Sequence, residues 1–479
     1  MTLLAARLSK QAKFAQPHRV QERLRASSLL GYPSLRWLVA FTLLATLGDA
    51  LAEALVSGAG LDIERYELRL HPDIDAGTLA GKQRIVARVL SDELRTATFD
   101  AGELTVQSVH REGVALEFER VERQLRIRLP VPARAGERLD LHLVYTGAPK
   151  HGLQFHSARR ELYTVFSTSQ WMICIDAPAE RAVFDLELIV PQALRVAANG
   201  RAIAQRDLDH GLRAHRWRQS EPVPSFLYGF AAAPYHEVQE KLGRVALRYL
   251  SLDQDEAQLR LTFADTGNML RFFERRAGFA YRGAYAQVLV ASTVGQEMAG
   301  LAVVSESYGK KVLDGPQNRA LLAHELAHQW WGVSITCRDW GHFWLNEGFA
   351  NFMAAAWLEH RFGAAAYRAQ VEGWERRLQR LRADGADRSL VYARWFRPSG
   401  DDRAVVYQKG AFVLHQLRLH LGERAFWQGI RAYTRAHRDS SVTTSDFRRA
   451  MERSSGRDLG PFFAEWVEGP VPTIAAQVE

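Results

Sequence analysis

The sequence predicts a two-domain protein, with an all-β, sandwich-like domain followed by a mainly helical α+β domain. From about residue 61 to 250, apolar residues alternate with polar ones, whereas after Asp253 the apolar spacing becomes helical. The chain has 479 residues, 47% of them hydrophobic, and is therefore long enough to bury two or three cores. The expected segments are a leader at 1–52, a β domain at 53–252 and a second domain at 253–479.

The leader has the pattern of an export signal. Arg36 precedes an eleven-residue apolar run over 37–47, and Ala50-Leu51-Ala52 has the small residues that a signal peptidase reads. The run is too short to span a bilayer comfortably as a helix. We expect cleavage after Ala52 and an exported, periplasmic protein. The 36 residues before the run are long for a signal. An over-extended start, an uncleaved anchor that holds the protein at the membrane facing the periplasm, and a soluble amphipathic leader therefore remain alternatives.

The segment after the leader is typical of half-buried strands. Its apolar residues lie two apart with polar or charged residues between them, and turn residues such as Asp73, Gly77 and Gly136 separate the runs. The clearest alternations are Tyr66/Leu68/Leu70, Leu125/Ile127/Leu129, Leu139/Leu141/Leu143 and Phe184/Leu186/Leu188. We expect this domain to shape the substrate site rather than to carry the chemistry.

The second domain begins with helical spacing and continues through a strand-like stretch that glycines interrupt. Near its end, Thr443-Thr444-Ser445-Asp446 is a capping-box start for a late helix. The other expected elements are a helix around 269–274, strand structure over 287–304, a helix from a cap at 314–317 to Gly332, and a helix from Asn346 to Arg361.

The residues that carry chemistry lie on two of these helices. His324 and His328 are four residues apart, so they lie one turn above each other on one helix face and can bind one metal ion. Glu325 points beside that face and can reach a water without being a ligand. Glu347, nineteen positions after His328, can approach if the two helices pack antiparallel. Three protein ligands, an open fourth position and a carboxylate base are the arrangement of a catalytic zinc site.

We therefore predict a zinc hydrolase with one Zn²⁺ per chain, bound by His324, His328 and Glu347, and with Glu325 as the general base. The alternative is that both histidines are ordinary helix residues, since the short H-E-x-x-H pattern also arises by chance in a chain with sixteen histidines.

These residues resemble the gluzincin aminopeptidases, the family of aminopeptidase N and the leukotriene-epoxide hydrolase. The family signature, H-E-x-x-H followed after eighteen residues by the E of W-L-N-E-G, is complete from His324 to Gly348. The resemblance also includes Tyr407-Gln408-Lys409-Gly410 and a closing stretch over 462–470, and it covers about residues 61–475. It implies a thermolysin-like catalytic domain at 253–479.

The resemblance also implies roles for residues outside the metal set. Tyr407, in the Y-x-K-G motif, would donate a hydrogen bond to the oxyanion of the tetrahedral intermediate. Glu297 would bind the free α-amine of a peptide and Gly295 its backbone, because both fall in the stretch that aligns with the family motif G-x-M-E-N. Glu325 would take a proton from water and return it to the departing amine.

The amine site departs from the family pattern in two places. Gln296 and Met298 stand where the motif usually has methionine and asparagine. The β domain contains the C-x-D-x-P segment at 174–178, but only Gln170 is available before it as the family's amine-binding glutamine or glutamate. Larger members also continue into a helical domain that roofs the cleft. We expect a more open cleft here, unless a partner or a second copy covers it.

The leading interpretation is a zinc metallopeptidase that releases N-terminal amino acids from peptides. One alternative keeps the zinc chemistry but cleaves internal or unusual amide bonds. Another is a non-catalytic binding scaffold that retains the fold, although such a scaffold has no chemical need for the complete residue set.

The charge argues against a nucleic-acid-binding protein, whereas the cysteine content leaves the state of the two thiols open. The leader carries a net +5 of the formal charge of +8, so +3 remains for the rest, and no nucleic-acid-binding motif accompanies it. We expect a peptide substrate and no nucleic acid. Cys174 and Cys337 have no metal-type spacing, so one disulfide and two buried thiols both remain open.

Overall fold

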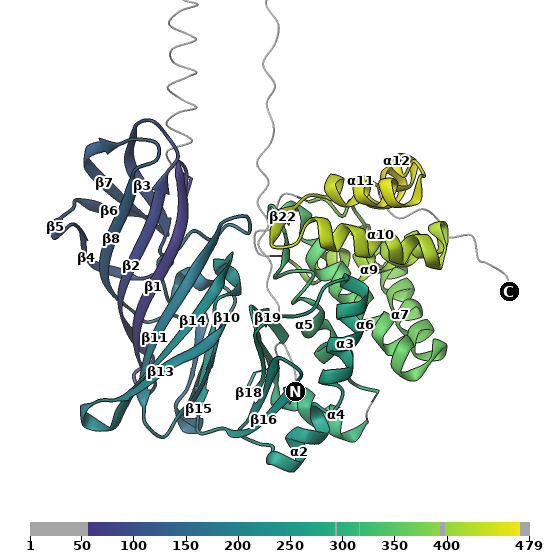
Figure 1. Cartoon of the computed structure of the whole chain (residues 1–479), viewed down its shortest axis with the longest axis horizontal. Coiled ribbons are helices and arrows are strands. Elements are labelled where there is room, and N and C mark those ends of the chain that lie inside the picture. Colours follow the sequence, from purple (N-terminus) through teal and green to yellow (C-terminus); the bar gives the residue numbers. More distant parts are fainter. Residues whose placement is uncertain (1–55, 293–294, 316, 393–397, 470–479) are drawn as a thin grey trace, which may run out of the picture. The chain divides into compact units, whose positions relative to one another are not determined.

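The computed structural model describes residues 56–292, 295–315, 317–392 and 398–469 (Figure 1). The predicted leader at 1–52 lies outside these residues, so export, the periplasmic location and membrane attachment stay predictions. Among the helices in the described ranges, none combines the length and the apolar composition needed to cross a membrane.

The first domain consists of strands, as the alternation predicts. Its main sheet has eight strands in the order β13-β14-β11-β1-β2-β8-β4-β5, and two smaller sheets have the orders β12-β15-β10-β9 and β3-β7-β6. The strands are β1 (Leu61–Asp73), β2 (Thr78–Val89), β3 (Leu94–Asp100), β4 (Thr105–Arg111), β5 (Val114–Ala115), β6 (Phe118–Val121), β7 (Gln124–Ala133), β8 (Arg138–Gly147), β9 (Gly152–His156), β10 (Glu161–Val165), β11 (Arg181–Pro191), β12 (Arg195–Ala198), β13 (Arg201–Asp207), β14 (Leu212–Pro224) and β15 (Phe230–Ala233).

A five-stranded sheet with the order β16-β17-β18-β20-β19 follows. β19 is at its edge and runs antiparallel to β20, while β18 is parallel to both β17 and β20. β16 and β17 lie before residue 253 in the sequence, and this sheet therefore extends across the expected domain boundary. Its strands are β16 (His236–Leu242), β17 (Val245–Ser251), β18 (Ala284–Val290), β19 (Gly295–Met298) and β20 (Leu301–Ser305).

Both faces of this sheet are buried. Along β18, Tyr285 and Leu289 belong to the core of the helical domain. The alternate residues Ala286 and Val288 instead pack in a separate core with Tyr163 of β10 and its neighbours. A strand whose successive side chains point to opposite faces is thus apolar on both, as in other sheets covered on two sides. This sheet therefore packs against the helical domain on one face and against the β domain on the other.

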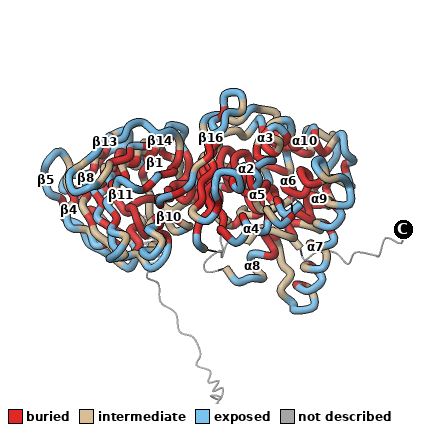
Figure 2. Tube along the Cα trace, turned by 90° about the horizontal axis from the view of Figure 1, so that it is seen from below, coloured by how far each residue is buried: buried red, intermediate tan, exposed pale blue. Residues whose placement is uncertain are grey.

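Helices form most of the remaining chain, which confirms the predicted fold class. Figure 2 shows long buried runs in α5 and α6, which are central, and more exposed residues along α7 and α8. The helices are α2 (Glu256–Thr262), α3 (Thr266–Ala277), α4 (Glu306–Asp314), α5 (Ala320–Ala327), α6 (Trp344–Phe362), α7 (Ala364–Ala383), α8 (Gly400–Ala404), α9 (Gly410–Leu421), α10 (Glu423–Ala436), α11 (Thr444–Ser455) and α12 (Gly460–Phe463), with two short strands, β21 (Ile335–Cys337) and β22 (Ser440–Val442).

Most expected elements of the second domain are present, but the ends of the first metal helix were predicted wrongly. The capping box at Thr443 starts α11 as expected. α5, however, begins at Ala320, because Asp314 is still the last residue of α4. It ends at Ala327 rather than near Gly332. After His328 the chain turns back on itself, with the Val333 amide donating to the His328 carbonyl at 2.8 Å.

Both cysteines are buried free thiols, which decides between the two alternatives left open by the sequence. Cys174 lies in a segment joined to the end of β3 by two backbone hydrogen bonds with Asp100. Two residues later, the Asp176 amide donates to Asp100 Oδ2 at 2.9 Å. Burial and the neighbouring Asp100 carboxylate raise the pKa of Asp176 to about 6.

This raised pKa predicts a pH-dependent stability. An unfolded aspartate titrates near 3.9, so between about pH 4 and pH 6 the folded chain binds more protons than the unfolded chain. Its stability must therefore fall as pH rises through this window. Between pH 4.5 and pH 7, the free energy of unfolding of Asp176→Asn should fall by about 2 kcal/mol less than that of the wild type. Urea unfolding at the two pH values measures this difference. Asp92→Asn, at an exposed residue, should follow the wild type, and identical pH profiles for all three proteins would contradict the prediction.

Candidate metal and active site

α5 and α6 bring the three predicted metal ligands together. His324 Nε2 and His328 Nε2 lie 3.3 and 3.5 Å from Glu347 Oε2, and the two nitrogens are 2.9 Å apart. A tetrahedral ion with metal–ligand bonds of about 2.0 Å requires donor atoms about 3.3 Å apart. The donor types and their separations therefore fit a zinc ion.

Buried polar atoms without partners point to the same conclusion. Among the described residues, Glu325 Oε2 and Glu347 Oε2 are buried without a hydrogen-bond partner. An ion or a water bound at this point would give these carboxylate oxygens a partner. His328 Nδ1 lies 3.0 Å from the Trp331 carbonyl. Since a carbonyl only accepts, Nδ1 carries a proton, so Nε2 is the nitrogen that would bind a metal, in place of a proton.

The electrostatics of the three ligands are strongly coupled. Burial alone would raise the pKa of Glu347, but His328 and His324 outweigh it and hold that pKa at about 2. Glu347 is thus an anion at every relevant pH, as a zinc ligand must be. For His324, burial lowers the pKa, which favours the neutral ring that binds metal.

Glu325 lies beside this cluster and is buried. Burial raises its pKa well above the usual value, and the carboxylates of Glu297 and Glu347 contribute to the shift. A Cβ atom on Gly295 would lie only 2.5 Å from Glu325 Oε1. A side chain at residue 295 would therefore displace the Glu325 carboxylate, so glycine leaves room for that carboxylate in its present position.

Glu297 approaches from the edge strand β19. With Glu325 and His328 it forms a second set of buried side chains whose donor atoms lie within 4.8 Å of one another. Burial raises its pKa to about 7, with a further contribution from Glu347. Gln329, just after α5, fixes this strand, because its side chain donates to the Met298 carbonyl and accepts from the Gly300 amide, both at 2.9 Å.

Tyr407 reaches the site from η6 (Val405–Lys409), a π-helical turn between α8 and α9. Such turns are frequent at functional sites, because they re-aim side chains within a helix. The Tyr407 ring stacks on His324 with a centroid separation of 5.8 Å. Burial raises the pKa of the phenol well above 10, so it remains a hydrogen-bond donor. With Asn351 and Trp374, it lines a cavity of about 760 Å³.

Two glycines allow η6 to approach the metal helix α6. A Cβ on Gly348 would lie 2.8 Å from Gly410 backbone atoms, and a Cβ on Gly410 would lie 2.9 Å from Gly348 Cα. The glycine after Glu347 and the glycine after Lys409 thus touch directly. This contact sets the distance between the ligand Glu347 and Tyr407.

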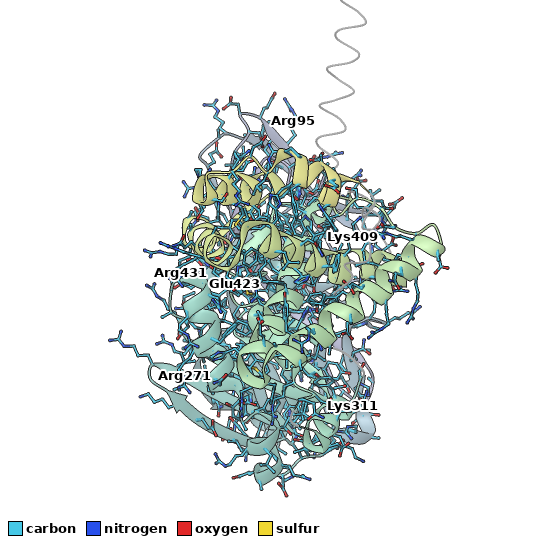
Figure 3. All side chains as sticks on the ribbon, turned by 90° about the vertical axis from the view of Figure 1, so that its right-hand side faces the viewer. Arg95, Arg271, Lys311, Lys409, Glu423 and Arg431 are labelled. Atoms are coloured by element: carbon cyan, nitrogen blue, oxygen red, sulfur yellow. The ribbon has the colours of Figure 1, made fainter. Side chains whose placement is uncertain are left out.

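Lys409 anchors the same turn. Its ammonium group is fully buried and donates to Asp387 Oδ1 at 2.9 Å, to the Gly469 carbonyl at 3.0 Å and to the Arg388 carbonyl. The lysine of the Y-x-K-G motif therefore joins η6 to two distant segments. Figure 3 labels Lys409 in the helical domain, together with Lys311.

Sequence reasoning missed several residues that support the site. Asn351 interacts with His324 and raises its pKa. Asn351 lies four residues after Glu347, which places both on one face of α6, so this spacing could have identified Asn351 from the sequence. The Asn346 side chain accepts from the Cys337 amide at 3.0 Å, and Trp344 Nε1 donates to Thr444 at 2.9 Å. These contacts join distant segments, and local spacing does not reveal them.

Comparison with known families accounts for most of the chain. The peptidase family M1 domain matches residues 268–466, and the peptidase M1 N-terminal domain matches residues 63–227. The chain belongs to peptidase family M1. This confirms the resemblance seen in the sequence.

Curated M1 relatives are longer than this chain. Aminopeptidase N of Streptomyces lividans is 27% identical over 447 residues, which cover 85% of this chain and 50% of that protein. Leucyl aminopeptidase of Saccharolobus solfataricus is 22% identical over 441 residues, covering 86% of this chain and 54% of that protein. The chain thus spans about half the length of these relatives.

Solved M1 structures of similar length also match. An M1 zinc metallopeptidase from Deinococcus radiodurans is 25% identical with a TM-score of 0.74, over 88% of this chain and 97% of that one. A variant of it bound to a Tyr-Ser-Ala substrate gives a TM-score of 0.76, again at 25% identity, over 88% of this chain and 98% of that one. Zinc is therefore the metal that the family implies, and the donor set here fits it.

The buried Lys409 contacts predict a stability effect. Lys409→Met should lower the free energy of unfolding by about 3 kcal/mol, because it leaves the buried Asp387 carboxylate without its closest cation. Urea unfolding of the purified chain measures the change. Lys311→Met, at an exposed lysine, is the matched control and should stay within about 0.5 kcal/mol of the wild type. Equal stability of the two variants would show that the Lys409 contacts contribute nothing.

Proposed function

We propose that this protein is a zinc-dependent aminopeptidase that releases N-terminal amino acids from peptides. The observation that carries the proposal is the meeting of two histidines and three buried glutamates at one point. His324, His328 and Glu347 form a zinc-type donor set. Glu325 and Glu297 lie against it and remain available for the water and for the substrate amine.

His324, His328 and Glu347 would hold the zinc ion. When bound, zinc supplies Lewis-acid chemistry, since it polarises a carbonyl oxygen and makes water more acidic. Glu325 accepts a proton from the attacking water as the water oxygen bonds to the scissile carbonyl carbon. The same carboxyl group then returns that proton to the amide nitrogen as the carbon–nitrogen bond breaks.

Tyr407 acts on the carbonyl group of the substrate's N-terminal residue, and Glu297 acts on the α-amine of the same residue. The protonated phenol of Tyr407 donates a hydrogen bond to the oxyanion that develops during attack. Glu297, as a carboxylate, pairs with the α-ammonium group, and the cationic amine itself favours this ionised form. β19 has a paired neighbour on only one side among the described strands, so its free edge can pair with an extended peptide.

The bound states of related structures support release of single N-terminal residues. One two-domain M1 zinc metallopeptidase variant binds L-tryptophan, with a TM-score of 0.75 and 25% identity to this chain. The Deinococcus radiodurans variant binds the tripeptide Tyr-Ser-Ala. A short peptide and a free amino acid are the substrate and the product types of an aminopeptidase. Cleavage of internal bonds needs no carboxylate to bind an α-amine. Substrates with free and with acetylated amines therefore distinguish the two activities.

The role of Glu325 predicts loss of turnover without loss of metal. Glu325→Gln keeps the shape of the side chain but cannot accept a proton, so kcat should fall by roughly three orders of magnitude. Zinc content, measured by atomic absorption, should stay near one ion per chain. Glu372→Gln, at an exposed residue of α7, is the matched control. A Glu325→Gln protein with a tenth or more of wild-type kcat would remove Glu325 as the base.

The role of Glu297 predicts a preference for free amines. The wild type should cleave aminoacyl-anilides faster than their N-acetylated forms. Glu297→Gln should lower kcat/KM for the free-amine substrates by roughly 10- to 100-fold, because a charge-assisted pair is lost. The acetylated substrates, which have no ammonium group, serve as the internal control. Faster cleavage of the blocked forms by the wild type would overturn the aminopeptidase proposal, and equal losses on both forms would refute the role of Glu297.

A further inference from the structure

A second cavity lies where the β domain meets the segment after α5, and arginines dominate it. It has a volume of about 470 Å³, within the range of small-molecule pockets. Its lining includes six arginines and only two acidic residues, Glu221 and Asp439. We call it the arginine pocket, and its arginines are Arg181, Arg201, Arg218, Arg244, Arg282 and Arg438.

Most of this positive charge is not neutralised by the protein. Within the described ranges, Arg201, Arg244 and Arg282 have no carboxylate within 4.0 Å. Asp439 is already engaged, since it lies 3.1 Å from Arg438 and accepts a hydrogen bond from Ser334. The pocket therefore has an excess of four positive charges over its own acids.

The strand register brings two of these six arginines together. Arg201 of β13 lies directly opposite Arg218 of β14. Like charges in that position destabilise a sheet unless an anion lies between or near them. Asp185 is the carboxylate nearest to Arg218, but it is shared with Arg65. One aspartate therefore serves two guanidinium groups.

Arg181, which also lines the pocket, makes its hydrogen bonds to uncharged groups, and Asp439 is the carboxylate that acts on it electrostatically. Arg181 donates to the carbonyls of Pro222 and Val333 at 3.2 and 3.0 Å and to Thr336 Oγ1 at 3.0 Å. All of these partners are neutral. Burial lowers its pKa only to about 10, so it remains a half-buried cation at neutral pH.

Arginines on a neighbouring part of the same sheet show the contrast. Arg69 and Arg84 each have a glutamate partner, at 3.2 and 3.3 Å, and Arg84 also pairs with Asp140 at 2.6 Å. Arginines gathered on a surface of this chain are therefore in some places paired with acids, unlike most of those in the pocket.

We propose that the arginine pocket binds a small oxyanion with two or more negative charges, such as a pyrophosphate or another phosphate-bearing group. The planar guanidinium group of an arginine can donate two parallel hydrogen bonds to two oxygens of one phosphate. The half-buried rings of Phe279 and Tyr281 also line the pocket.

The pocket is distinct from the metal site but joined to it. His324, Glu325, Glu297 and Tyr407 are not among its lining residues. Gln329 and Val333 do line it, and they flank the turn that follows the metal ligand His328. An anion bound in the pocket would fix the position of the Arg181 guanidinium group. Arg181 donates to the Val333 carbonyl, so this turn would be fixed with it.

Titration calorimetry of the purified, zinc-loaded chain tests the proposal. The probes are inorganic pyrophosphate and sulfate at constant ionic strength. Sulfate does not chelate zinc, and zinc content is measured after each pyrophosphate titration. The wild type should bind both probes saturably, with pyrophosphate tighter. Arg181→Gln should weaken binding roughly tenfold or more, and Arg244→Gln, at an exposed residue that is safe for folding, by several-fold. Arg271→Gln, at an arginine that Figure 3 labels on the outer surface of α3, should match the wild type.

Two results would overturn the proposal. One is the absence of saturable binding of either probe up to about 10 mM. The other is equal affinity in the wild type and in the Arg181→Gln, Arg244→Gln and Arg271→Gln proteins. Since the readout is binding rather than peptide cleavage, neither result bears on the aminopeptidase proposal.

Discussion

The burial of three carboxylates beside two imidazoles is the constraint on which the rest of the structure depends. Glu297, Glu325 and Glu347 are each at most 6% exposed, and water cannot solvate them. Uncompensated carboxylates in such a place are strongly unfavourable, so the site needs a cation. Two metal-ligating histidines at the same point indicate how that cation is held. The surrounding helices keep water out and thereby strengthen every electrostatic interaction inside the site.

This concentration of charge is possible because the backbones approach unusually closely. Gly295 leaves space for the Glu325 carboxylate, and Gly348 and Gly410 let α6 touch the turn that carries Tyr407. Gly332 has a φ of +142° and packs against His328, whose Nδ1 would lie 2.7 Å from an added Cβ. The glycines of the sequence motifs are therefore packing elements. They determine where the charged atoms lie, although they carry no chemistry themselves.

The sequence predicted what depends on local spacing and missed what depends on tertiary contact. The four-residue interval of His324 and His328 fixes their common face on any helix, so their proximity follows from the sequence alone. The closeness of Glu347 required an assumption about helix packing, and the family motif supplied it. By contrast, the three partners of Lys409 lie 21 to 60 residues away in the sequence, and no periodic pattern connects them. The end of α5 was misplaced for a related reason, since the turn after His328 is held by hydrogen bonds with residues up to Ile335.

The β domain is part of the active site's support rather than an independent module. Glu297 lies on β19, at the edge of a sheet that is covered on one face by helices and on the other by the strands around Tyr163. The amide of Phe166, next to β10, donates to the Gln296 side chain at 2.6 Å and so contacts the same strand directly. If this face of the sheet were exposed, Ala286, Val288 and Val303 would lose their packing partners, and β19 would lose its fixed position. The amine-binding carboxylate therefore depends on residues about 130 positions earlier in the chain. For this reason, the helical domain alone could retain the metal ligands but not the arrangement that distinguishes an N-terminal amine.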